Sequence, residues 1–178
     1  MVDPSFIKEK IQQKLRSFDT ILPQLQALNS QTQGTFKVKL YQGREWIKAL
    51  YDEVTHSKTT LKAFLWADHI DPEIEKYLYN IYLPKRVDAW ICCQAIVSDT
   101  DANRYFADSD NVPKTETRII TTKTFDLDCE MILFDHTKIL VATLSPDEMS
   151  GLLIESKNLH KSLENIFNLL WSLYTPKK

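Results

Sequence analysis

Residues 125–155, FDLDCEMILFDHTKILVATLSPDEMSGLLIE, decide how this chain folds. Three apolar runs with strand-like composition follow one another here, at 127–134, 137–144 and 151–155. Asp135-His136 stands where a tight turn joins the first two runs, and a Ser-Pro-Asp sequence separates the last two. Apolar runs separated by turn-forming residues are typical of antiparallel strands. The stretch therefore predicts a β-meander that the rest of the chain must cover.

The chain on either side of the meander alternates between strand and helix patterns. We expect strands at 36–40, 61–67, 90–97 and 118–122, and helices at 46–54, 71–81 and 156–174. In the helix over 71–81, Asp71-Pro72 forms the N-terminal cap, and the expected buried stripe is Ile74, Tyr77, Leu78 and Ile81. The order predicts an α/β fold with a mixed sheet covered by helices, starting with a βαβαβ unit.

The N-terminal segment has a different pattern. Asp3-Pro4 is a helix start, and apolar residues then recur at heptad a and d positions, namely Ile7, Ile11, Phe18, Ile21, Leu25 and Leu28. A polar linker ends this segment, so we expect a coiled-coil-like helix and linker over 1–34 and the α/β domain over 35–178. The stripe either packs on its own domain or forms a dimerisation arm. Its position outside the sheet-forming region favours the arm and a homodimer.

Composition excludes several classes of protein. The 178 residues carry 22 Lys and Arg against 24 Asp and Glu, and this balance argues against broad attraction to nucleic acid or anionic membrane. The three cysteines lack CxxC spacing and are expected to be reduced thiols. No apolar run reaches the roughly 18 residues of a membrane span. We expect a cytoplasmic protein without a membrane partner.

Motifs for cofactors and metals are also missing. Only three glycines are present, so neither of the common Gly-rich nucleotide-binding loops can be written. Acidic residues from Asp99 to Asp110 have partial EF-hand spacing, but Arg104 stands where that loop needs Gly. The four histidines show no zinc-binding spacing. We therefore expect no cofactor and no metal.

Polar residues at strand ends are the candidates for ligand binding. Ligands of open α/β sheets bind beyond the carboxyl ends of strands. Trp66, Asp68, His69, Ser98 and Asp99 follow two expected strands, and Arg86 ends the helix between them. Each of these has the alternative of lying in an ordinary solvated loop. The other three tryptophans are expected in the core.

Glu130 is a further candidate because it interrupts an apolar strand. A buried carboxylate needs a partner. A three-residue turn in the meander places Glu130 and Lys138 on one face of the sheet, whereas a two-residue turn places them on opposite faces. An ion pair between them is possible only with the longer turn.

His136-x-Lys138 begins the phospholipase D pattern H-x-K-x4-D, but Thr143 occupies the position of its Asp. These residues belong to a series of fragments: LPQLQAL, VKLYQGREWIKALYDEV, LKAFLWADHI, YLPKRVDAWI, TFDLDCEMILFDHTKILVAT and GLLIESKNLHKSLENIFNLLW. The series resembles the C-terminal part of TrmB-like transcriptional regulators, including residues Gly43, Arg86, Glu130, Lys138, Gly151, Phe167 and Trp171.

That resemblance implies a phospholipase D-like fold without the catalytic set. It implies a noncatalytic domain for effector sensing, dimerisation or both, in which DNA is bound only through a winged-helix domain that is absent from this chain. A small-molecule effector is the implied partner. The alternative is a phosphodiesterase that uses the degenerate His136-Lys138 motif.

Overall fold

The computed structural model describes residues 36–66, 68–107, 112–121 and 128–174. Several expectations fall outside these described residues. They are the dimerisation helix and linker over 1–34 and the expected strand ends at Ala67, Thr122 and Leu127.

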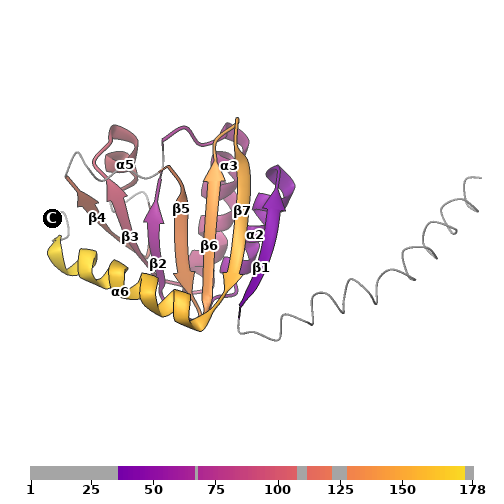
Figure 1. Ribbon diagram of the computed structural model, residues 1–178. Helices are drawn as coiled ribbons and strands as arrows, with labels where there is room; N and C mark the ends of the chain where they lie inside the picture. The colour runs from indigo at the N-terminus through magenta and orange to yellow at the C-terminus, as the bar shows by residue number, and fades with distance from the viewer. Residues whose placement is uncertain (1–35, 67, 108–111, 122–127, 175–178) are drawn as a thin grey trace, which may run out of the picture. The chain divides into compact units, whose positions relative to one another are not determined.

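The described chain forms one seven-stranded mixed sheet (Figure 1). Its strands are β1 (Lys37–Gln42), β2 (Leu61–Leu65), β3 (Cys93–Ser98), β4 (Thr115–Ile120), β5 (Glu130–Phe134), β6 (Lys138–Leu144) and β7 (Met149–Glu155). They are ordered β1-β7-β6-β5-β2-β3-β4. Because β5, β6 and β7 are consecutive antiparallel neighbours, the predicted meander is confirmed.

The expected βαβαβ start is wrong in its first strand. β1 pairs antiparallel with β7 at the edge of the sheet, whereas β2, β3 and β4 form the parallel part. The alternating pattern of the first strand predicts that it is extended and half-exposed. The pattern does not show which strand β1 pairs with, and in the structure that strand is β7.

Helices cover both faces of the sheet. α2 (Arg44–Val54) and α3 (Pro72–Tyr77) lie behind it in Figure 1, and α6 (Lys157–Leu173) crosses its front. α3 continues through a π-helix, η1 (Leu78–Tyr82), into α4 (Leu83–Asp88), and the short α5 (Asp101–Phe106) precedes β4. On the α6 side, Phe167 packs edge-on against Phe64 with ring centroids 5.3 Å apart. Within the described part of the chain, no helix is both long and apolar enough to cross a membrane.

The π-helix corrects the predicted buried stripe. Pro84 has no N–H to donate and its ring would crowd the carbonyl four residues back, so a regular α-helix is disfavoured here. The wider π turn adds one residue and shifts the phase of all that follows. Ile81 is consequently 45% exposed, while Tyr82 and Arg86 face the sheet at 6% and 1%.

Two of the three tryptophans expected in the core are exposed, since Trp46 is 63% and Trp90 81% exposed. Trp171 is partly buried and packs on the core as expected, stacked on Phe167 with ring centroids 5.5 Å apart. Trp90 lies in a left-handed turn between α4 and β3, where the Lys114 ammonium sits 3.4 Å from its ring centroid. The expected strand over 90–97 begins only at Cys93, so strand alternation does not define the direction of the Trp90 side chain.

Candidate functional site

A cavity lies between the sheet and the helix that runs from α3 to α4. The volume of this cavity is about 70 Å³. Its walls are almost entirely apolar or aromatic, and two side chains of the charged residue types, Glu130 and Arg86, reach it. The principal aromatic and aliphatic lining residues are Tyr51, Leu65, Trp66, Ile70, Leu78, Tyr79, Tyr82, Cys93 and Phe106. We call this space the Glu130 cavity.

Glu130 is the first residue of β5 and is 5% exposed. Its carboxylate accepts a short hydrogen bond from the Tyr51 hydroxyl and one from the Trp66 backbone N–H. Burial disfavours the charged carboxylate and raises its pKa from 4.5 to about 7, although the two hydrogen bonds partly oppose this effect. The cavity thus holds a carboxyl group that gains or loses its proton near neutral pH.

The geometric condition for an ion pair between Glu130 and Lys138 is met, but the ion pair does not form. Phe134 pairs with Lys138, so the turn has three residues and Glu130 and Lys138 share a face of the sheet. However, Glu130 begins β5 and Lys138 follows its far end, and a strand rises by about 3.3 Å per residue. Lys138 instead contacts Asp135 at 3.2 Å. Tyr51 is the partner, and its place on the buried face of α2 was the available signal.

Arg86 lies inside the domain rather than at the expected rim. Its guanidinium donates to the carbonyls of Ile91 and Pro113 at 2.8 and 3.0 Å, and to the Thr115 hydroxyl at 2.7 Å. These bonds join the end of α4 to the starts of β3 and β4. Burial raises the pKa of Tyr82 and of the Cys93 thiol. The charge of Glu130 raises both pKa values further, and the charge of Arg86 opposes the increase.

The remaining predicted ligand residues do not line the cavity. Asp68 accepts from the Thr100 hydroxyl at 2.9 Å, and Ser98 accepts from the Asn103 side-chain amide at 3.0 Å. Asp99 pairs with Arg104 at 2.6 Å. The ring of His69 lies 6.4 Å from that of Trp66. Of the predicted set, the structure brings Trp66, Arg86 and Glu130 together around one space.

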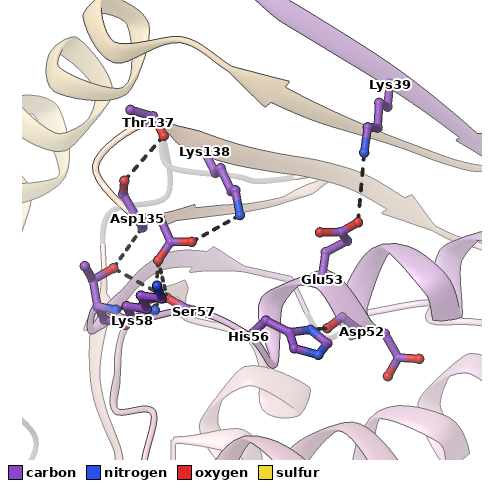
Figure 2. A network of polar contacts seen from close by, with 10 residues as sticks. Lys39, Asp52, Glu53, His56, Ser57, Lys58, Asp135, Thr137 and Lys138 are labelled. Carbon is purple, nitrogen blue, oxygen red and sulfur yellow. Dashed lines mark hydrogen bonds and ion pairs between the residues drawn. The ribbon is translucent and has the colours of Figure 1, made fainter.

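The β5–β6 hairpin carries the H-x-K fragment, and its polar network is shown in Figure 2. The Asp135 carboxylate accepts from the Lys58 backbone N–H at 2.8 Å, the Ser57 hydroxyl at 3.2 Å and the Lys138 ammonium at 3.2 Å. Burial alone would raise the pKa of Asp135, but these donors outweigh it and the pKa is lowered. Asp135 therefore holds the hairpin to the loop before β2, and Lys138 pairs with Asp135 from within the hairpin.

His136 is exposed at the tip of this hairpin, as predicted. The neighbouring His160 ring lies 6.4 Å from it, but His160 is 3% exposed, and burial lowers its pKa. A buried neutral imidazole does not reach a phosphodiester. If the phospholipase D spacing is instead aligned on Asp135, Asp128 takes the place of its His and Glu130 that of its Lys. Neither alignment restores the catalytic residues.

Comparison with solved structures identifies the architecture. No protein-family model matches the chain, and no curated protein matches it in sequence. Nuc from Salmonella typhimurium, a phospholipase D family member, has a TM-score of 0.59 and 11% identity over 80% of this chain and 99% of its own. The fold is phospholipase D-like. NucT from Helicobacter pylori is similar, with a TM-score of 0.58 and 9% identity over 80% of this chain and 99% of its own.

The chain is also similar in structure to a DNA-binding protein. TrmBL2, an archaeal chromatin protein with a novel mode of DNA binding, has a TM-score of 0.50 and 15% identity over 97% of this chain and 67% of its own. The expected fold class is confirmed, and the resemblance to TrmB-like proteins is seen in the fold.

Proposed function

We propose that this chain is a noncatalytic regulatory domain of a TrmB-like transcriptional regulator. It binds a small-molecule effector in the Glu130 cavity and associates as a homodimer, and DNA is contacted by a winged-helix domain. The observation that carries the proposal is the cavity itself, which lies between the phospholipase D-like sheet and its helices and contains a buried carboxyl group. Apolar cavities with few polar groups are the usual form of small-molecule sites.

The state of the β5–β6 hairpin supports a noncatalytic role. Phospholipase D chemistry needs a His nucleophile, an orienting carboxylate and a Lys that stabilises phosphoryl oxygens. Here Thr143 replaces the carboxylate and hydrogen-bonds to Ser150 at 3.0 Å, and Lys138 is engaged by Asp135. Loss of the orienting Asp of a catalytic triad costs about 10⁴ in rate, which gives the scale of the deficit by analogy.

Self-association is supported by an apolar surface of the domain. Val38 and Leu40 of β1 are 50% and 61% exposed, and they pair with Ile154 and Leu152 of β7 on the same face. Monomeric proteins seldom expose a large continuous apolar patch. We assign this β1–β7 strip to a second copy of the chain, together with the heptad positions Ile7 to Leu28.

Hydrolysis of bis(p-nitrophenyl) phosphate tests the noncatalytic role. The purified chain is assayed beside His136→Ala and Thr143→Asp. We expect no turnover by the unchanged chain above that of His136→Ala. Turnover that disappears in His136→Ala would refute the noncatalytic role and make the phosphodiesterase the better account.

Sedimentation tests the homodimer. The unchanged chain is expected to dimerise at micromolar concentration, and Leu40→Lys to weaken the dimer by placing a charge in the β1–β7 strip. Lys37→Glu on the same strand is the control, since Lys37 makes only a 3.7 Å contact with Glu155 at the surface. A monomeric unchanged chain at high micromolar concentration would contradict the assignment.

A further inference from the structure

We propose that the effector of the Glu130 cavity is a small organic cation, a primary amine on a short apolar body, whose ammonium group binds the Glu130 carboxylate. This inference rests on the proposed effector-sensing function and specifies the chemical class of the ligand.

The first support is the unused capacity of the Glu130 carboxylate. An ionised carboxylate offers about four acceptor positions. Two donors reach Glu130, the Tyr51 hydroxyl and the Trp66 N–H. Among the described residues, no Lys, Arg or His forms an ion pair with it. Since buried charges in proteins are normally paired, a cation is the missing complement of the ionised group.

The walls of the cavity are the second support. Aromatic rings attract cations through their faces, and this attraction grows when water is excluded. Five aromatic side chains surround the space, from α2, the end of β2, η1 and α5: Tyr51, Trp66, Tyr79, Tyr82 and Phe106. Leu78 and Ile70 supply the surface for an apolar body. The π-helix that carries two of these rings is a feature frequent at functional sites.

Size and charge at the other end limit the ligand. A space of about 70 Å³ exceeds the roughly 15 Å³ that one water needs on the same measure, so it admits a body of a few heavy atoms. Arg86 offers an anion little, because both of its Nη atoms already donate to carbonyls and to Thr115.

Protonation of Glu130 should couple to binding. The ionisable groups that face it are Tyr51, Tyr79, Tyr82, Cys93 and Cys129, with Arg86 beyond, and burial raises the pKa of each Tyr and Cys so that they stay neutral near pH 7. An aliphatic amine stays charged to about pH 10. Amine binding selects the ionised carboxylate, so the affinity should rise with pH up to about 7 and then level off.

Titration by NMR with three probes of equal length tests the proposal. Butylammonium, butanol and butyrate are added to the full chain, and the amide shifts of Leu65 and Ile70 give the affinities. We expect butylammonium to bind at least about tenfold more tightly than the other two. Glu130→Gln should remove this preference and leave the affinity for butanol unchanged. Glu148→Gln, at an exposed position, is the control and should bind all three probes as the unchanged chain does.

Three outcomes would overturn the inference. Tighter binding of butyrate would show that Arg86 makes this an anion site, and equal affinities for butylammonium and butanol would show an apolar cavity without a cation position. Either result leaves the noncatalytic domain standing, because that function fails only on phosphodiester turnover. Retention of the preference in Glu130→Gln would equally refute the assigned contact.

Discussion

Glu130→Gln is expected to stabilise the chain above neutral pH. In the folded chain the pKa of Glu130 is about 7, against 4.5 for the ordinary carboxyl group. Between these values the folded state keeps a proton that the unfolded state releases. This contribution to stability is complete below pH 4.5 and is lost as the pH rises through 7.

The size of the effect follows from the same two pKa values. At about 1.4 kcal/mol per pH unit, the difference corresponds to about 3 kcal/mol of stability lost between pH 4.5 and 8. Gln keeps an acceptor oxygen for the Tyr51 hydroxyl and the Trp66 N–H but carries no charge to desolvate. The Gln variant should therefore gain up to about 3 kcal/mol over the unchanged chain at pH 8, and far less at pH 5.

Urea denaturation at pH 5, 6, 7 and 8 measures this difference. The comparison at each pH cancels the opposite contribution of His160, whose lowered pKa makes stability fall as the pH drops below 6.5. Glu148→Gln, at an exposed position, is the control and should show no such trend. Parallel pH profiles for the unchanged chain and Glu130→Gln would refute the claim that Glu130 is a buried, unpaired carboxyl group.

Three further substitutions test other contacts. Tyr51→Phe should cost about 1–3 kcal/mol and raise the pKa of Glu130 further, because it removes a donor to the carboxylate. The free energy of unfolding measured against pH reports both effects. A pH profile identical to that of the unchanged chain would contradict the contact. Gly151→Ala should cost about 1–3 kcal/mol, because its Cβ would lie 2.4 Å from a Leu50 methyl carbon. A thermal unfolding midpoint equal to that of the unchanged chain would contradict this. Arg86→Met should cost about 3 kcal/mol or more, because it leaves buried carbonyls without donors. Arg104→Met, at an exposed ion pair, should cost far less, and equal losses in urea denaturation would show that Arg86 is not a structural cation.

The sequence patterns predicted what local physics determines. Turn residues and apolar runs located the meander. The helix expected over 156–174 is α6, and Ser156 caps it by accepting from the Leu159 N–H at 3.3 Å. The polar residues after β2 and β3 do meet at one edge, as the hydrogen bond between Asp68 and Thr100 shows. This proximity follows from the parallel pairing of β2 and β3, which places the carboxyl ends of both strands at the same edge of the sheet.

The errors came from contacts between distant segments and from one local departure from regular helix geometry. The place of β1 depends on the edge that β7 offers, and the phase of the helix after Leu78 depends on a π turn beside Pro84. That one-residue shift carries Arg86 inward and Ile81 outward, so no regular helical spacing could have located them. Glu130 was recognised as needing a partner, but Tyr51 is distant in sequence, and only the packing of α2 on the sheet brings it there.

The central claim is that the Glu130 cavity, rather than the His136-Lys138 hairpin, is the binding site of this phospholipase D-like domain. One NMR experiment compares the two places directly, by titrating the chain in turn with butylammonium and with inorganic phosphate. The account predicts that butylammonium shifts the Leu65 and Ile70 amides, and that phosphate leaves the Asp135 and Thr137 amides unmoved. Saturable shifts of the Asp135 and Thr137 amides on adding phosphate, with no shift of the Leu65 and Ile70 amides on adding butylammonium, would contradict it.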